Sequence, residues 1–397
     1  MAEPAGFGRR RFLALASVAA AAACGSTVVR DRRVRWRPVE FAPPAGATAR
    51  VSVWRPTAAG WWASGAVVSA DREFEPGLWR SPDGVTWERL TTAPATFYGA
   101  SSDLVALAVG PDGAVCLGTA AGKGIHGNPR RAQWRLDGNM LREVVTSFEQ
   151  YGGPQMVGFR ALTHGPTGYA LIGTRRSVTT GRTGAAVWVS PTGDDMELLD
   201  TAPGLAPSAG EQTNGLGITA TAAGYVAVGD GFATTGTDAT THGRAWVSDD
   251  ARSWTPAPFE RAGAPTSVQT VDTDGAVTVA AGVVTDGAAT RLAAWSSTDP
   301  ARRWVRHDIG VLGADATAAV TEATTVAVGA DAWWVGGRLG TTPVLARSPD
   351  GGRHWTAVAL PADVPSGPQV RVAVAVRRGL VLVSITTAER ELTIAAA

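Results

Sequence analysis

The sequence predicts an all-β fold built from repeated four-stranded antiparallel units, and three observations support this prediction. A Ser-x-Asp turn followed by a tryptophan returns along the chain at intervals of roughly 50 residues, the length of one four-stranded repeat. Short β-branched segments bounded by glycine separate the copies of this turn. After residue 34 no long amphipathic helical pattern interrupts them.

The clearest copy of the Ser-x-Asp turn runs from Ser348 to Trp355. The short side chains of Ser348 and Asp350 can accept hydrogen bonds from backbone N–H groups inside a tight hairpin turn, and Trp355 then begins a strand with a large ring to bury. Two further copies are one residue shorter. The residues assigned to the three turns are Ser81, Asp83 and Trp87, then Ser248, Asp250 and Trp254, then Ser348, Asp350 and Trp355.

A second series of tryptophans marks the strand before each turn. These residues are Trp79, Trp134, Trp188, Trp246 and Trp295. Their spacing is close to that of the turns, so each is expected to occupy the same place in its repeat. A large apolar ring at one repeated place predicts a core position in every unit.

The two ends of the chain determine the number of repeats. Two good strands follow Trp355, at 370–375 and 380–385, and a third lies at 391–394, but no Trp-led fourth strand follows. The segment Trp36 to Phe41 resembles Trp254 to Phe259 and can supply it. The sequence therefore predicts a seven-bladed β-propeller over residues 34–397, closed by an N-terminal strand that completes the last blade; six blades is the alternative.

The N-terminal segment predicts export. Arg9 and Arg10 lie in a stretch that resembles a twin-arginine signal, and the apolar run 12–23 that follows is shorter than the about 20 residues that span a bilayer. Cys24 follows three alanines, which resembles a bacterial lipobox in which the cysteine is lipidated. We expect residues 1–23 to be a signal peptide, 24–33 a tether, and the mature chain to be held on the outer face of the cell membrane; simple cleavage and secretion is the alternative.

Composition and charge exclude several classes of function. The formal net charge of +1 gives no reason to expect a nucleic-acid partner, and two cysteines cannot build a disulfide framework. Cys116 lies in an apolar strand pattern and is expected to be a buried, inert thiol. The five histidines are scattered without metal-ligand spacing, so neither a metal nor a cofactor is expected, and a monomer is expected.

The repeated turns resemble the Asp box, S-x-D-x-G-x-x-W, of sialidase-type and related β-propellers. This resemblance implies the same fold, with the turns on the face away from the sialidase active site. Sialidases use an Arg-Ile-Pro motif, three arginines, an acid/base residue and a late Tyr–Glu nucleophile pair. The chain has no Arg-Ile-Pro and its last tyrosine is Tyr225, so the resemblance does not extend to catalysis.

A first candidate site is the mouth of the central channel, where the innermost strands begin. Alignment of these strands predicts one polar residue from each blade: Arg50, Asp103, Arg160, Asn214, Gln269, Glu322 and Arg371. Guanidinium groups there could hold an anionic or glycan ligand through charge-assisted hydrogen bonds. The alternative is that these residues pair with one another around a water-filled channel.

A second candidate is the face that carries the long loops of blades two to four, called the loop face below. Variable loops on a rigid scaffold often bind partners. Its candidate residues are Lys123, His126, Arg130, Arg131, Tyr151, Arg175, Arg176, Arg182, Phe232 and His242.

The Trp-Trp pairs Trp61-Trp62 and Trp333-Trp334 begin second strands. Core packing is their expected role, and a sugar-stacking platform is the alternative.

Together these features predict a non-catalytic binding or assembly module at the cell envelope, with an envelope protein or glycan as its partner. A divergent sialidase-like glycoside hydrolase or lyase is the alternative, and Asp103 with Glu322 would be its carboxylates.

Overall fold

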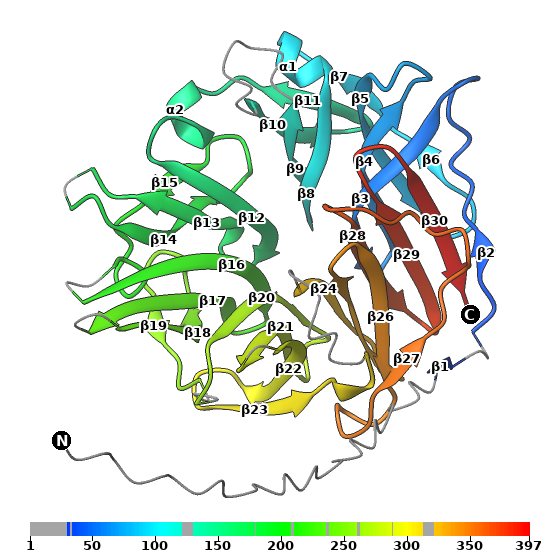
Figure 1. The fold of residues 1–397 in the computed structure, drawn as a ribbon. Coiled ribbons are helices and arrows are strands. Elements are labelled where there is room, and N and C mark those ends of the chain that lie inside the picture. The colour runs from blue at the N-terminus through cyan, green and yellow to red at the C-terminus, as the bar shows by residue number, and fades with distance from the viewer. Residues whose placement is uncertain are drawn as a thin grey trace, which may run out of the picture.

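The computed structural model describes residues 30–31, 34–120, 130–178, 180–207, 210–235, 238–259, 263–287, 289–312 and 321–397. These residues form seven blades around a central axis, and in Figure 1 the strands that surround this axis are β3, β8, β12, β16, β20, β24 and β28. The seven-bladed prediction is therefore confirmed. The proposed export and lipidation residues Arg9, Arg10 and Cys24, and the loop residues Lys123 and His126, lie outside the described residues.

The first four blades follow one another along the chain, each with four strands ordered from the channel outward. Blade 1 has β3 (Thr48–Thr57), β4 (Gly60–Val68), β5 (Phe74–Ser81) and β6 (Glu88–Arg89). Blade 2 has β8 (Ser102–Gly110), β9 (Gly113–Ala120), β10 (Arg130–Asp137) and β11 (Met140–Val144). Blade 3 has β12 (Met156–Gly165), β13 (Gly168–Arg176), β14 (Thr183–Ser190) and β15 (Glu197–Leu199). Blade 4 has β16 (Glu211–Thr221), β17 (Gly224–Thr235), β18 (Asp238–Ser248) and β19 (Thr255–Pro256).

The remaining three blades complete the ring, and the last one uses both ends of the described chain. Blade 5 has β20 (Thr266–Thr273), β21 (Thr278–Asp286), β22 (Ala289–Asp299) and β23 (Arg303–Asp308). Blade 6 has β24 (Thr321–Val328), β25 (Trp333–Leu339), β26 (Thr342–Ser348) and β27 (Thr356–Val358). Blade 7 has β28 (Arg371–Arg377), β29 (Leu380–Thr386), β30 (Glu391–Ala396) and, outermost, β2 (Arg37–Pro38).

The predicted ring closure is present. β2 pairs antiparallel with β30, with Arg37 opposite Ala395 and Pro38 opposite Ile394. In Figure 1 the blue N-terminal strand lies beside the red C-terminal one. Because blade 7 takes its outer strand from the N-terminal side of blade 1, the first and last blades cannot separate without losing a strand.

Two short outer strands were not predicted. β1 (Arg30–Asp31) lies in the stretch expected to be a tether, and it pairs in parallel with β27 of blade 6. β7 (Thr91–Ala93) pairs in parallel with β11 of blade 2. Each gives its blade a fifth strand. Two or three residues carry too little pattern to be recognised as a strand from sequence.

Tryptophan rings fill the core, as the spacing predicted. Trp79, Trp134, Trp188, Trp246 and Trp295, all on third strands, are at most 1% exposed. They belong to hydrophobic clusters whose members come from neighbouring blades. Cys116 is also fully buried, and burial raises the pKa of its thiol, in keeping with an inert core residue.

Helices contribute little to the described fold. They are α1 (Phe97–Ala100), α2 (Phe148–Tyr151) and one 3₁₀ turn, Gly310–Leu312. Thr96 caps α1, since its Oγ1 accepts a hydrogen bond from the N–H of Gly99 at 2.9 Å. None of the helices in the described ranges has the length and apolar character needed to cross a membrane.

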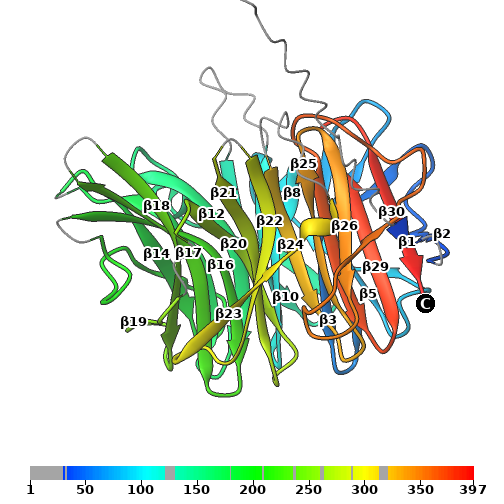
Figure 2. The same cartoon turned by 60° about the horizontal axis from the view of Figure 1, so that its bottom comes forward.

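The alternating strand directions sort the connections onto two faces (Figure 2). Hairpin turns between first and second strands share one face with the Ser-x-Asp turns between third and fourth strands; we call this the turn face. Second-to-third connections and the segments between blades lie on the loop face. The channel mouth, where the first strands begin, also opens on the loop face.

The Ser-x-Asp turns are held by their acidic residue. In the Ser248 copy, Oδ1 of Asp250 accepts hydrogen bonds from Ser248 Oγ at 3.0 Å and from the N–H groups of Arg252 and Ser253 at 2.7 and 2.9 Å. The Asp83 copy repeats these bonds, whereas in the Asp350 copy the carboxylate accepts from Ser348 Oγ and from one backbone N–H, that of His354 at 2.9 Å. The backbone N–H donors lower the pKa of all three carboxyls, that of Asp350 to about 2.

Neighbouring acidic residues in one turn provide a matched test of this bonding. Asp250→Ala should lower the free energy of unfolding at pH 7 by about 1 kcal/mol, the usual cost of losing a side chain that caps backbone N–H groups. Because the folded-state pKa lies below the unfolded value, this contribution is present above about pH 4 and disappears as the pH falls through the folded pKa. Urea unfolding at pH 7 and at low pH measures both effects. Asp249→Ala is the control, and an equal loss in both variants would contradict the account.

Candidate functional site at the channel mouth

A repeated β-bulge directs one residue of the inner strand into the channel. In blades 1 to 6 the register between first and second strands shifts at the same place. A bulge leaves one residue without a cross-strand partner and turns its side chain out of the ladder. The residues at these positions are Ser52, Val105, Arg160, Leu216, Gln269 and Thr324, and all of them line the central cavity.

This register corrects the alignment made from sequence. Arg160 and Gln269 are bulge residues, whereas Arg50, Asp103, Asn214 and Glu322 lie two positions earlier on their strands. The true equivalents of that earlier layer in blades 3 and 5 are Gly158 and Ser267. A bulge leaves no mark in the hydrophobic pattern of a strand. The alignment made from sequence therefore puts residues of two different layers of the channel into one layer.

The cavity inside the mouth has a volume of about 240 Å³. Of the seven predicted mouth residues, Arg160, Gln269, Glu322 and Arg371 line it. Arg50, Asp103 and Asn214 do not line it, and each of them makes a side-chain contact at the rim.

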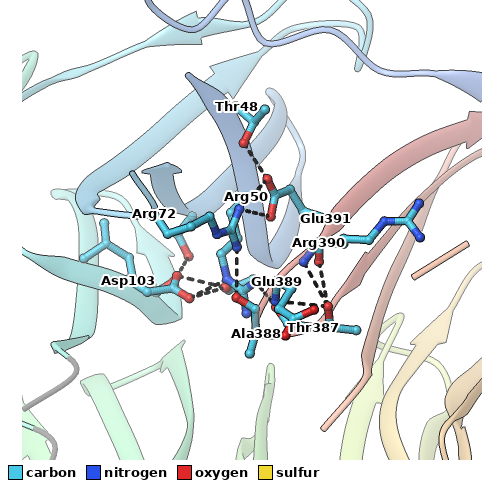
Figure 3. Close-up of polar contacts among 12 residues, drawn as sticks. Thr48, Arg50, Arg72, Asp103, Thr387, Ala388, Glu389, Arg390 and Glu391 are labelled. Atoms are coloured by element: carbon cyan, nitrogen blue, oxygen red, sulfur yellow. Dashed lines mark hydrogen bonds and ion pairs between the residues drawn. The ribbon is translucent and has the colours of Figure 1, made fainter. Parts of the chain in front are cut away.

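The rim contacts join blades 1, 2 and 7 (Figure 3). Arg50 donates from Nε to Oδ2 of Asp103 at 3.0 Å and from Nη1 to the carbonyl of Thr387 at 2.6 Å. Ser52 Oγ donates to the same carboxylate at 2.9 Å. Burial raises the pKa of Asp103, while Arg50 and Ser52 oppose this effect by stabilising its charged form.

A second contact at the same rim ties blade 7 to blade 1. Arg72 donates from Nη1 to both carboxylate oxygens of Glu391 at 3.2 Å and from Nη2 to the carbonyl of Ala388 at 2.9 Å. Thr48 Oγ1 donates to Glu391 as well. Figure 3 shows these groups converging on the loop between β29 and β30.

Three other mouth residues are also paired. Glu322 accepts a hydrogen bond from Nε of Arg338 at 3.0 Å, a partner that the sequence analysis missed. Asn214 donates to Asp230 at 2.6 Å, and Gln269 Oε1 accepts from the backbone N–H of Ala323 at 2.7 Å.

Arg160 and Arg371 differ from these residues. Within the described part of the chain, neither guanidinium makes a hydrogen bond or an ion pair at contact distance with a protein group. Both side chains are exposed to the channel. Enclosure by the channel wall lowers the pKa of Arg371, Glu322 opposes this shift, and the positive charges of Arg160, Arg338 and Arg50 add to it. Arg160 and Arg371 therefore act on each other as like charges that face one cavity.

Arg55, which the sequence did not single out, also lines the cavity. Arg55 extends from blade 1 and donates to the carbonyls of Leu107 and Leu162, each at 3.2 Å from Nη2, in blades 2 and 3. Asp272 provides the compensating charge, and its Oδ2 accepts from the N–H of Val328 at 3.0 Å. Burial lowers the pKa of Arg55 and raises that of Asp272.

The loop-face candidates divide into structural and accessible residues. Tyr151 is buried and donates to Gln133 at 2.7 Å, and Arg175 donates to the carbonyl of Glu149 at 3.3 Å. Arg130 stacks on Phe148, with its guanidinium carbon 4.4 Å from the ring centroid. It lines a second cavity of about 180 Å³ together with Arg131.

The described residues include no group of three or more histidine, cysteine or acidic side chains placed to hold a metal ion.

The Arg50–Asp103 pair gives a direct stability prediction. The two side chains are 13% and 6% exposed, so removing one leaves the other charge nearly buried. Asp103→Ala should lower the free energy of unfolding by about 3–5 kcal/mol. The double variant Arg50→Ala with Asp103→Ala should lose less than the sum of the single variants. Urea denaturation measures all three, and strict additivity would contradict the coupling.

Comparisons with known proteins support the fold and do not identify a family. No protein-family model and no curated protein matches the chain. The solved structure of polysaccharide lyase Uly1 aligns with 90% of this chain and 92% of its own, at 10% identity and a TM-score of 0.51. The β-propeller domain of the Trilobed protease from Pyrococcus furiosus aligns over 88% and 95%, at 10% identity and a TM-score of 0.49. Trypanosoma rangeli sialidase aligns over 91% and 58%, at 12% identity and a TM-score of 0.43. At these identities the similarity concerns the fold: the chain is an all-β, seven-bladed propeller.

Proposed function

We propose that this propeller is a non-catalytic binding module of the cell envelope that recognises an anionic glycan at its channel mouth. The observation that carries the proposal is that the guanidinium groups of Arg160 and Arg371 face one cavity and have no partner within the described ranges. A guanidinium is always charged and offers a planar set of donors that fits carboxylate or sulfate groups.

The charge balance at the mouth favours an anion. Four arginines, Arg50, Arg160, Arg338 and Arg371, act together there, against the carboxylates of Asp103, Asp230 and Glu322. Asp103 and Glu322 are paired with Arg50 and Arg338, and the neutral side chains of Asn214 and Ser267 hold Asp230, so one positive charge remains in excess at the mouth. An incoming anion would compensate the mutual repulsion of Arg160 and Arg371.

The absence of a sialidase-like nucleophile supports binding without hydrolysis. No tyrosine follows Tyr225 in the sequence, so blades 5 to 7 cannot supply a tyrosine nucleophile. Asp103, one of the two carboxylates considered for a hydrolase, is held by Arg50 and Ser52 outside the cavity.

A divergent glycoside hydrolase is the second candidate, and one observation favours it. Glu322 and Asp272 both line the cavity, and burial raises the pKa of Asp272. Glycosidases work with two carboxyl groups, of which one is kept protonated. Turnover of a reporter glycoside that disappears in Glu322→Ala would favour this candidate over simple binding.

Binding of charged oligosaccharides tests the proposal. The purified propeller should bind at least one member of a panel made of oligogalacturonate, a heparin-derived tetrasaccharide and sialyllactose, measured by titration calorimetry. Arg160→Ala and Arg371→Ala should each weaken that binding by about 10- to 100-fold, because each removes hydrogen bonds to a charged group. Raising the salt concentration should also weaken it.

The control for this experiment is Arg353→Ala, an exposed arginine in a Ser-x-Asp turn on the opposite face. It should leave the affinity unchanged. Equal affinity in all three variants would contradict the proposal. If no member of the panel binds, the glycan assignment is wrong, and an acidic protein partner becomes the occupant to test.

The envelope location has a separate test. Arg9→Lys with Arg10→Lys should keep the chain in the cytoplasm of the producing cell, and Cys24→Ala should move it from the detergent-soluble membrane fraction to the medium. Cell fractionation followed by immunoblotting reads both outcomes. Unchanged fractionation of both variants would contradict export and lipid anchoring.

A further inference from the structure

Two tryptophan pairs occupy equivalent places in blades 1 and 6. Trp61 and Trp62 lie at the start of β4, and Trp333 and Trp334 lie at the start of β25. In both blades the second tryptophan lies opposite an arginine of the third strand, Arg80 in blade 1 and Arg347 in blade 6. The two blades therefore offer a matched comparison of one tryptophan–arginine pair.

In blade 6 the arginine covers the ring. The guanidinium carbon of Arg347 lies 5.7 Å from the centroid of Trp334, which is only 4% exposed. The next residue across the sheet is Thr356, which has no charge to attract the guanidinium. Val34 of the N-terminal segment lines the adjoining cavity. This tryptophan is a core residue, as the sequence analysis expected.

In blade 1 an acidic residue takes the arginine instead. Glu88 occupies the place of Thr356, and Arg80 donates to it from Nε at 2.8 Å and from Nη2 at 3.2 Å. No cation–π contact between Arg80 and Trp62 is present among the described residues of this blade. Trp62 packs against the buried cluster of Leu78 and Leu107 but remains partly exposed. The partner of the arginine therefore differs between the covered ring and the accessible one, and the covered ring also packs in a cluster with Val381 and Ile394 of blade 7.

The accessible ring borders a cavity of about 520 Å³ on the turn face. Trp62, Arg80 and Glu88 line it, together with Gly60 and Pro82. The Arg80 and Glu88 side chains are 37% and 58% exposed, so their outer polar atoms are accessible from the cavity. An indole face beside a guanidinium–carboxylate pair combines an apolar platform with both donors and acceptors.

We infer that this cavity is a binding site for an uncharged pyranose ring. The C–H face of such a ring would stack on Trp62, and its hydroxyl groups would donate to Glu88 and accept from Arg80. Because Arg80 and Glu88 neutralise each other, the site has no excess charge to favour an ionised sugar. The site lies on the face opposite the channel mouth, so it is independent of the anion site proposed above.

Saturation-transfer NMR with simple glycosides tests the inference. The probes are methyl β-D-glucopyranoside, methyl β-D-galactopyranoside, methyl α-D-mannopyranoside and the methyl glycoside of N-acetylglucosamine. At least one should receive saturation at its ring C–H protons. Trp62→Leu should raise the Kd at least about tenfold by removing the platform.

Glu88→Thr is the sharper variant, because it copies the residue found in blade 6 and changes an exposed side chain. It should release Arg80 to cover Trp62 and weaken binding by a similar factor, with an unchanged melting temperature. Arg353→Ala, which removes an exposed arginine from the blade 6 turn on the same face, should leave the Kd unchanged. Absence of saturation transfer from all four glycosides, or equal binding by Glu88→Thr and the unmodified protein, would overturn the inference.

Discussion

The pairing of β2 with β30 is the constraint on which the rest of the molecule depends. Each blade packs its tryptophan-centred core against its neighbours, and such a stack is stable as a ring only if its first and last members are joined. The bonds from Arg50 to Thr387 and from Arg72 to Glu391 reinforce this junction on the loop face. Once the ring is closed, the seven inner strands face one another and the bulges of blades 1 to 6 meet around one cavity.

Both proposed sites lie where a repeated position lacks its usual partner. At the bulge, Ser52, Gln269 and Thr324 each bond to the inner strand of the next blade. Arg160 has no such partner among the described residues, and its charge faces the channel. The same reasoning distinguishes Trp62 from Trp334. In blade 1 Glu88 binds Arg80, whereas in blade 6 the equivalent arginine, Arg347, lies over the ring of Trp334. In both cases the backbone of the blade is the same as in the other blades, while one side chain differs from those at the equivalent positions.

The sequence predicts the architecture well because the architecture follows from residue types that recur at a fixed spacing along the chain. Trp79 and its equivalents are large rings at one repeated place, and only burial in each blade accommodates them. The site is harder to predict. Bulges leave no trace in an apolar pattern, so Arg160 and Gln269 were placed in the same layer as Arg50. Partners such as Arg338 and Arg55 are invisible from sequence because they reach their acceptors across strands or blades.

Direct observation of an anion is the most decisive test of the channel-mouth site. A crystal of the propeller soaked in sodium bromide, with diffraction collected at the bromine absorption edge, locates every ordered bromide by its anomalous signal. The account predicts a bromide within hydrogen-bonding distance of the guanidinium groups of Arg160 and Arg371. Ordered bromide elsewhere on the surface, with none at these two arginines, would contradict the claim that they form an anion-binding site.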